Sequence, residues 1–170
     1  MGEFYNRILK TEAGQKLLKS LGLPTPVTLS RYTGQTVFFE GNVLMGASKN
    51  AAVLSQLSKT LLDAKANLYF PANSNVAGDI KAAVEATGQK TQQVSCEKGA
   101  LTEKFDALIF DATGFESGKD LKNLYRFFSP VIRKLNKHGR ILILGRPHML
   151  SNTPQQAACM RALEGFSRSL

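Results

Sequence analysis

The sequence predicts an α/β protein in which a parallel sheet of about five strands carries helices on both faces. From residue 43 onward, short aliphatic runs alternate with longer segments whose apolar residues recur at helical spacing, which is the pattern of repeated strand–helix units. The run Ala107–Phe110 is apolar without alternation, as expected of a strand buried on both faces of a parallel sheet. The chain has 170 residues, 43% of them hydrophobic, which suffices for such a core without disulfides.

The chain begins with a helical arm, which we place at residues 1–40, before the domain at residues 41–170. Apolar residues between Glu3 and Leu21 allow a helix that is interrupted near Gly14. Residues 24–40 have no helical period and are interpreted as a covering segment. The two parts therefore differ in pattern, and the sheet belongs to the second.

Within the domain, predicted strands and helices alternate. The predicted strands are residues 43–47, 68–70, 92–96, 107–110 and 141–144. The predicted helices are residues 53–62, 79–87, 121–135 and 153–170. Pro130 bends or interrupts the third helix, and His138 with Gly139 ends it. Thr153 as N-cap and Gln156 three residues later predict a capping box at the start of the last helix.

Composition excludes several classes of protein. No apolar run reaches the roughly 18 residues of a membrane span, and the first residues lack the apolar stretch of a secretory signal. Cys96 and Cys159 are far apart, which predicts neither a disulfide framework nor a zinc site. His138 and His148 have no second ligand at metal-binding spacing, so no metal is expected. We expect a cytoplasmic protein.

The net charge of +9 favours encounter with an acidic partner. The densest basic cluster surrounds the end of the third predicted helix and consists of Arg133, Lys134, Lys137 and Arg140. No basic stripe interleaved with aromatic residues is present, so nucleic acid is not an expected partner.

Ligands of parallel α/β sheets bind at the carboxyl ends of the strands, so a functional site is expected in the loops there. After the first strand, Gly46 is present, but Asn50 and Ala52 stand where a dinucleotide-binding loop requires further glycines. Lys49 at the start of the following helix can attract an anion. Asp111, which follows the strand 107–110, is the acidic residue best placed for function, although an aspartate that begins a turn is more often structural. Gly46, Lys49 and Asp111 are thus candidate remnants of a cofactor site.

Most of the chain is covered by five segments that resemble one known family. They are GQKLLKSLGLPTPVTLSRY (residues 14–32), GNVLMGASKNAA (41–52), FDALIFDATG (105–114), FFSPVIRKLNKHGRILILG (127–145) and RALEGFSRSL (161–170). They resemble the short-chain dehydrogenase/reductase family, and specifically the N-terminal domain of large-form 3-oxoacyl-[acyl-carrier-protein] reductases. The resemblance implies a degenerate Rossmann-like or flavodoxin-like domain. In the whole protein, a complete ketoreductase domain that uses NADH or NADPH would follow it.

The resemblance also locates the positions of the family's catalytic residues. The tyrosine position falls on Gln156, the lysine position on Met160 and the serine position on Arg146. Neither Gln156 nor Met160 can take part in the proton transfer that the tyrosine and lysine perform. The family's Asn-Asn-Ala-Gly motif is replaced by residues 111–114. We therefore expect no catalysis and no cofactor in this chain.

The resemblance thus implies a non-catalytic domain of a fatty-acid reductase that acts as a structural or oligomerisation module. Helices within residues 119–135 and 153–170 are expected to dock on the catalytic domain of the same or a neighbouring chain, giving a homo-oligomer. Two alternatives stay open. One is retained binding of NAD(P)H or an acyl thioester at the candidate remnants. The other is docking of an acidic acyl carrier protein on the basic cluster.

The sequence does not distinguish the dehydrogenase order of strands from the flavodoxin order. No helix stop signal follows Leu170, so we expect a piece of a longer protein.

Overall fold

A computed structural model of the chain describes residues 11–22, 41–72, 74, 77–85, 91–97 and 100–170. The chain divides into two compact units, residues 1–35 and residues 36–170. The sequence places the boundary at residue 40, which lies outside the described residues.

In the first unit, the described helix α2 spans Glu12–Ser20. The Gly14 N–H donates a hydrogen bond to Thr11 Oγ1 at 3.2 Å, so a threonine precedes the helix as its cap. Gly14 lies in the first turn and does not interrupt the helix, contrary to the prediction. Its N–H is one of the donors that every helix leaves unpaired at its start, and the threonine satisfies it. The predicted helical residues 3–10 and the covering segment 24–40 lie outside the described residues.

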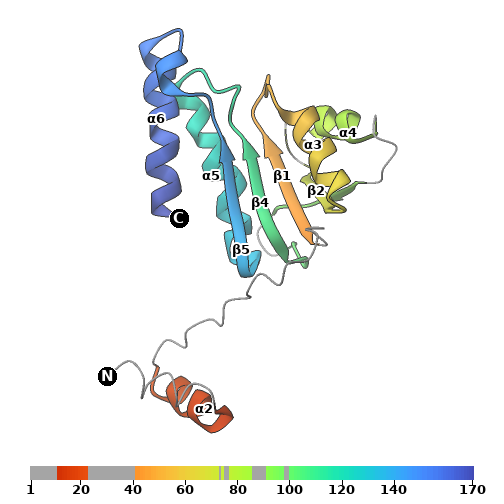
Figure 1. Cartoon of the computed structure of the whole chain (residues 1–170), viewed down its shortest axis with the longest axis vertical. Coiled ribbons are helices and arrows are strands. Elements are labelled where there is room, and N and C mark those ends of the chain that lie inside the picture. Colours follow the sequence, from red (N-terminus) through yellow and green to blue (C-terminus); the bar gives the residue numbers. More distant parts are fainter. Residues whose placement is uncertain (1–10, 23–40, 73, 75–76, 86–90, 98–99) are drawn as a thin grey trace. The chain divides into compact units, whose positions relative to one another are not determined.

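The described part of the second unit contains a sheet flanked by helices (Figure 1). The strands are β1 (Asn42–Ala47), β2 (Asn67–Pro71), β3 (Gln92–Val94), β4 (Phe105–Asp111) and β5 (Leu135–Leu144). The helices are α3 (Leu54–Asp63), α4 (Ala77–Glu85), α5 (Leu121–Val131) and α6 (Pro154–Ser169), with 3₁₀ turns η1 (Gly118–Asp120), η2 (Ile132–Lys134) and η3 (His148–Leu150). No described helix is long and apolar enough to cross a membrane.

The sheet is parallel throughout and has the strand order β3-β2-β1-β4-β5. This is the Rossmann order of dehydrogenases and not the flavodoxin order, which settles the question that the sequence left open. The chain proceeds outward from β1 to β3 and then returns to the other side of β1 for β4. The carboxyl ends of β1 and β4, where Ala47 lies opposite Asp111, therefore form the switch point at which such sheets bind ligands.

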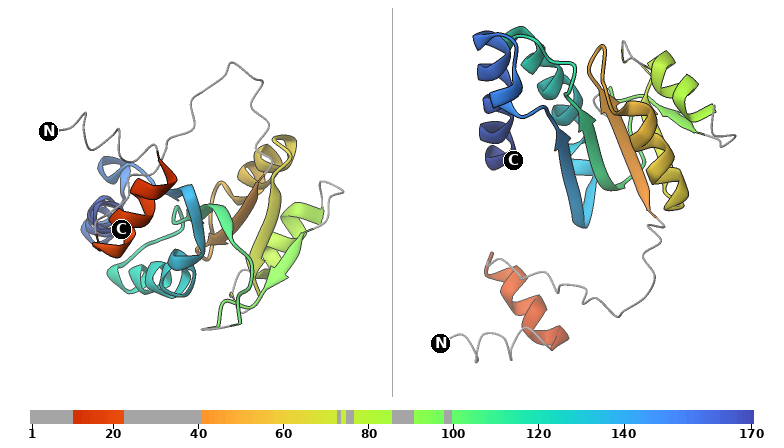
Figure 2. Two further views of the ribbon diagram at one scale, coloured as in Figure 1. Left: turned by 90° about the horizontal axis from the view of Figure 1, so that it is seen from below. Right: turned by 45° about the horizontal axis from the view of Figure 1, so that its top comes forward.

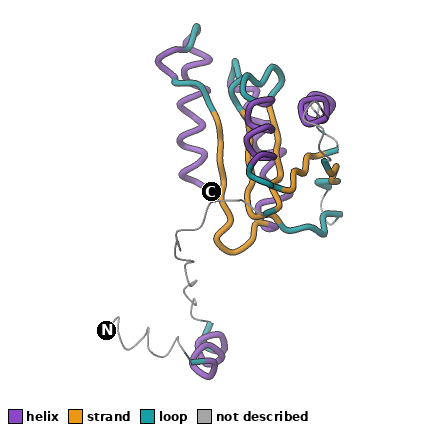
Figure 3. The backbone as a smooth tube through the Cα atoms, turned by 45° about the vertical axis from the view of Figure 1, so that its right-hand side comes forward, coloured by secondary structure: helices purple, strands orange, loops and turns teal. Residues whose placement is uncertain are grey.

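Two hydrophobic layers enclose the sheet, because successive residues of a strand face opposite sides. Val43, Met45 and Ile109 belong to the layer under α3 and α4. Leu44 and Phe110 belong to the layer under α5 and α6. Figure 2 shows the two helix pairs on opposite sides of the sheet, and Figure 3 shows the strands between helices. This is the predicted three-layer architecture.

The boundary between α5 and β5 differs from the prediction. Instead of running to residue 135 and ending at His138 and Gly139, helix α5 ends at Val131, and η2 leads directly into β5. Pro130 lies inside α5, one residue before its end, so it does not interrupt the helix as predicted. The chain instead tightens into the 3₁₀ turn η2 directly after α5. The basic cluster accordingly spans η2 and the start of β5 rather than a helix end.

His138 and Gly139 lie in an irregular stretch of β5. Phe105 of β4 pairs with Leu135 of β5, and Ala107 of β4 pairs with Arg140 of β5. Between these two pairs β5 is three residues longer than β4, so the register shifts there. His138 takes a left-handed conformation with φ of 63°. A Cβ on Gly139 would lie 2.6 Å from Leu135 Cδ1, so only glycine fits there.

Candidate functional site

The candidate site lies at the switch point, where the loop after β1 meets the loop after β4. The Ser48 N–H donates to the Asp111 carbonyl oxygen at 2.7 Å, and the Gly114 N–H donates to Ser48 Oγ at 3.0 Å. Ser48 is buried. A Cβ on Gly114 would lie 2.8 Å from the carbonyl carbon of Asn50, so the two loops touch backbone to backbone. Direct protein contacts therefore close the switch point.

The Asp111 carboxylate sits in the middle of this closure and is fully buried. Its Oδ1 accepts hydrogen bonds from the Thr113 N–H at 3.0 Å and from the Thr113 hydroxyl at 2.6 Å. Its Oδ2 accepts from the Val53 N–H at 3.2 Å. Thr113 Oγ1 in turn accepts from the Ala52 N–H at 2.7 Å. Val53 is the N-cap residue of α3, so a side-chain anion lies at the start of that helix.

These hydrogen bonds affect whether the N-terminus of α3 can bind a phosphate group. The N-terminus of a helix carries a partial positive charge and free N–H groups, which together attract phosphate. In the Rossmann order, the helix after β1 is the one that holds the pyrophosphate of a dinucleotide. Here the carboxylate of Asp111 supplies negative charge to α3, and the N–H groups of Ala52 and Val53 already have acceptors. At the N-cap residue Val53 and the residue before it, an incoming phosphate would meet a carboxylate and two N–H groups that already have acceptors.

The other two candidate remnants have different surroundings. Gly46 lies inside β1 and is buried; a Cβ there would lie 2.6 Å from the ring of Phe127 in α5. Its missing side chain thus makes room for a core aromatic ring. Lys49 is exposed on the loop. Asn50 has a φ of 59°, a left-handed conformation that asparagine tolerates better than most residues other than glycine.

The three family catalytic positions lie where β5 passes into α6. The Arg146 N–H donates to Met160 Sδ at 3.3 Å, so the structure brings these two residues together. The Arg146 side chain is exposed, whereas Met160 is buried in the core under α6. Neither residue offers a group that could donate a proton to a carbonyl at neutral pH.

Gln156 is part of the start of α6. Its N–H donates to Thr153 Oγ1 at 3.2 Å, as the predicted cap requires. Its side-chain Oε1 accepts from the Asn152 N–H at 3.0 Å, one residue earlier than in a standard capping box. Its Nε2 donates to the Phe115 carbonyl oxygen at 3.4 Å. The amide thus ties α6 to the loop after β4, which is a structural task.

No activated nucleophile was found among the described residues of this edge. The Cys159 thiol lies nearby and donates to the Ser117 carbonyl oxygen at 3.2 Å. Burial raises the pKa of this thiol, and the negative charge of Asp120 raises it further. Cys159 therefore stays protonated and unreactive at neutral pH. The described residues also contain no group of three His, Cys, Asp or Glu side chains that could hold a metal ion.

Sequence reasoning missed Ser48 and Thr113 as members of the site. Thr113 could have been found, because an aspartate followed two residues later by a threonine often forms a hydrogen-bonded turn. Ser48 gave no such signal, because its partner Gly114 is 66 positions away in the sequence.

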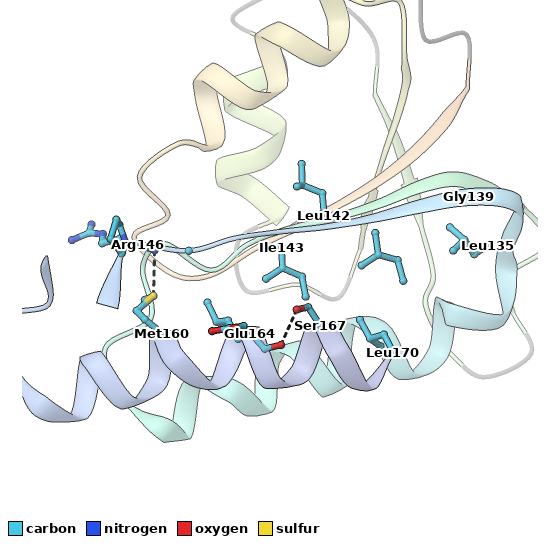
Figure 4. Close-up of a pocket in the computed structure, with 13 residues that line it drawn as sticks. Leu135, Gly139, Leu142, Ile143, Arg146, Met160, Glu164, Ser167 and Leu170 are labelled. Carbon is cyan, nitrogen blue, oxygen red and sulfur yellow. Dashed lines mark hydrogen bonds between the residues drawn. The ribbon is translucent and has the colours of Figure 1, made fainter. Parts of the chain in front are cut away.

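A cavity of about 720 Å³ lies elsewhere, along β5 and α6 (Figure 4). Arg146 and Met160 line it, but Gly46, Lys49 and Asp111 do not. The structure thus separates the candidate remnants of a cofactor site from the hollow beside α6.

Comparison with known proteins supports the fold. The sequence matches no protein-family model and no curated protein. Among solved structures, a short-chain dehydrogenase/reductase from Serratia marcescens matches with a TM-score of 0.50 and 17% identity, over 78% of this chain and 68% of that one. A mutant Serratia marcescens short-chain dehydrogenase/reductase matches with a TM-score of 0.50 and 18% identity, over 76% and 66% of the two chains. The described unit therefore shares the Rossmann-like fold of these enzymes.

Proposed function

We propose that this chain is a non-catalytic domain of a cytoplasmic, NAD(P)H-dependent 3-oxoacyl-[acyl-carrier-protein] reductase of fatty-acid metabolism. In that protein it acts as a structural and oligomerisation module beside the ketoreductase domain. The observation that supports an inactive cofactor site is the Asp111 carboxylate, which accepts a hydrogen bond from the N-cap residue of α3, the helix whose start holds the cofactor pyrophosphate in Rossmann domains.

The size of this effect can be judged from Coulomb's law. Two like unit charges about 4 Å apart repel by roughly 4 kcal/mol at the effective dielectric constant near a protein surface. Because about 1.4 kcal/mol corresponds to a factor of ten, such repulsion turns micromolar affinity into affinity near the millimolar range. The side chains of Asn50 and Ala52 further obstruct the loop where close approach of a pyrophosphate needs glycine.

Calorimetric titration with NADH and NADPH at low and moderate salt tests the inactive site. We expect no binding below the millimolar range for the full chain. The matched variant Lys49→Gln removes the exposed cation of the loop. Micromolar binding that persists at moderate salt and weakens in Lys49→Gln would refute the proposal. It would favour the alternative of a retained nucleotide site.

The oligomerisation role is assigned to α5 and α6, which lie on the same side of the sheet. On α5, Tyr125 is a large side chain that is 68% exposed and points away from the core. We expect Tyr125→Glu to weaken self-association in sedimentation experiments. Gln56→Glu is the matched control, because it adds the same charge at an exposed position of α3 on the other face. Equal sedimentation of all three proteins as monomers would contradict this role.

Docking of an acyl carrier protein is the second candidate function, and the basic cluster favours it. Arg133, Lys137 and Arg140 are exposed, and no salt bridge within the described residues involves them. Exposed cations without salt bridges attract an acidic protein in a salt-dependent way. The double variant Arg133→Glu/Lys137→Glu should abolish binding of acyl carrier protein at low salt. Binding that is indifferent to this reversal would exclude the cluster.

A further inference from the structure

Helix α5 has one buried side and one basic side. Its buried residues recur at the spacing of one side of a helix and are Leu124, Phe127, Phe128 and Val131. Its exposed residues include a second set at the same spacing, namely Lys122, Tyr125, Arg126 and Ser129. Residues three and four positions apart are neighbours on a helix surface. The two basic side chains and the tyrosine therefore lie together, on the side of α5 that is turned away from the sheet.

Two further cations extend this surface into the 3₁₀ turns at the two ends of α5. Lys119 lies in η1, three residues before Lys122. Arg133 lies in η2, four residues after Ser129. Both residues are exposed. The resulting surface is called the α5 face below, and its members are Lys119, Lys122, Tyr125, Arg126 and Arg133.

The positive charge of the α5 face is not compensated by nearby carboxylates. Residues 121–137 contain no aspartate and no glutamate. The carboxylate of Asp120 accepts hydrogen bonds from the Glu116 N–H at 3.0 Å and from the Ser117 N–H at 2.9 Å, so it serves the turn before the helix. No salt bridge within the described residues involves the α5 face. Its four cations are therefore available to an anionic ligand.

Tyr125 adds an aromatic ring to these cations. The tyrosine is 68% exposed, and it is the aromatic residue among the exposed large hydrophobic residues of the described part of the chain. Proteins that bind single-stranded nucleic acid combine cations, which hold the phosphates, with aromatic side chains on which unpaired bases stack. Apolar core residues separate the members of the α5 face in the sequence, so only the folded helix assembles them into one surface.

We propose that the α5 face binds single-stranded nucleic acid. The phosphates of the strand lie against the four cations, and one base stacks on the ring of Tyr125. Contacts to phosphate carry no sequence information, and every base has a face that can stack, so binding is independent of sequence. The proposal goes beyond the proposed function, because it requires neither a ketoreductase domain nor a cofactor.

Fluorescence anisotropy with labelled oligothymidylate and oligouridylate, each about 12 nucleotides long, tests the proposal on the full chain. For single strands, the logarithm of the binding constant falls by about 0.7 per phosphate contact for each tenfold rise in salt. Contacts from four cations therefore predict saturable binding that is roughly 50-fold weaker at about 200 mM than at about 50 mM salt. Absence of saturable binding at the lower salt would overturn the proposal, as would binding that salt does not weaken.

Charge reversal locates the binding surface. Lys122→Glu/Arg126→Glu should weaken binding of the oligonucleotide roughly tenfold or more, because two attractive charges become repulsive. Lys59→Glu/Lys81→Glu is the matched control, since it changes the net charge by the same amount at exposed positions of α3 and α4. Circular dichroism shows whether both variants keep their fold. Equal weakening by the two pairs would show attraction by net charge alone and would overturn the proposal.

Substitutions of Tyr125 test the stacking. Tyr125→Leu should weaken binding roughly fivefold or more, whereas Tyr125→Phe keeps the ring and should keep the affinity. Equal affinity of these two variants would overturn the proposal. Displacement of the oligonucleotide by polyglutamate at the same concentration of charge would identify an acidic protein as the occupant, and the proposal would be wrong. A dimer that Tyr125→Glu dissociates and that does not bind the oligonucleotide would also overturn it, because the α5 face would then be a contact between copies.

Discussion

Replacing Asp111 by asparagine tests whether its carboxylate holds the two loops together at the ends of β1 and β4. The carboxylate accepts three hydrogen bonds, one from the Val53 N–H and two from Thr113. An amide of the same shape has one acceptor oxygen and one NH₂ donor. In one orientation the NH₂ of the asparagine faces the Val53 N–H, and in the other it faces the Thr113 N–H. In both orientations one buried backbone N–H therefore faces another donor and loses its acceptor.

The cost follows from burial and from the charge of the acceptor. A hydrogen bond to a charged group contributes about 1.5–3 kcal/mol, and a buried donor left without a partner costs about 1–3 kcal/mol. Asp111 is fully buried, so water cannot replace the lost acceptor. We therefore expect Asp111→Asn to lower the free energy of unfolding by about 2 kcal/mol. For a chain of this size, that corresponds to a melting temperature lower by roughly 4–8 °C.

Urea unfolding followed by circular dichroism measures this change. Asp63→Asn is the control, because it removes the same charge at an exposed position of α3. Surface changes of this kind usually stay within about 0.5 kcal/mol. If Asp111→Asn also stays within that range, the carboxylate does not hold the loops. The structural interpretation of Asp111 would then be wrong.

Three further predictions concern packing, capping and pH. Gly46→Ala should destabilise by about 1–3 kcal/mol in thermal unfolding, because its Cβ would lie 2.6 Å from the Phe127 ring; Gly165→Ala, with nothing within 4 Å, should instead stabilise by about 0.5–1 kcal/mol. Thr153→Ala should cost about 1 kcal/mol, measured in urea, through loss of the α6 cap. Burial raises the pKa of the Cys96 thiol from 9.0 to about 11. Between pH 9 and about 11 the thiol therefore ionises in the unfolded chain but not in the folded one, so the free energy of unfolding falls as the pH rises through this interval and is unaffected by Cys96 below it. The Cys96→Ser variant should lose less stability across that interval, and an identical pH profile would count against the shift.

Local patterns predicted most of the fold. β1 and β4 follow from short aliphatic runs, and the start of α6 follows from its threonine cap. The same reasoning failed between residues 132 and 139, where Leu135 continues the apolar spacing of α5. In the structure that leucine instead begins β5 opposite Phe105. An apolar residue at helical spacing therefore does not show where a helix ends, because a strand that follows also needs apolar residues.

The candidate site was harder to predict than the fold. The sequence identified Asp111 as the acidic residue at the right strand end, and its turn with Thr113 is a local feature. The bond between Ala52 and Thr113 joins residues 61 positions apart. Only the strand order, with β4 beside β1, brings them together. Long-range hydrogen bonds of this kind leave no periodic signal, which is why sequence patterns reveal the missing glycines but not the carboxylate that is bonded to the start of α3.

The two edges of the sheet differ in the free energy that a partner could gain there. At the switch point, the N–H groups of Ala52, Val53 and Gly114 already donate to acceptors in this chain. A ligand that bound these N–H groups would have to replace hydrogen bonds that the chain already makes, so it would gain little free energy from them. Along β5, the backbone groups have no partner strand beyond β4 among the described residues and Leu142 is exposed, so a strand placed there would gain both hydrogen bonds and apolar burial.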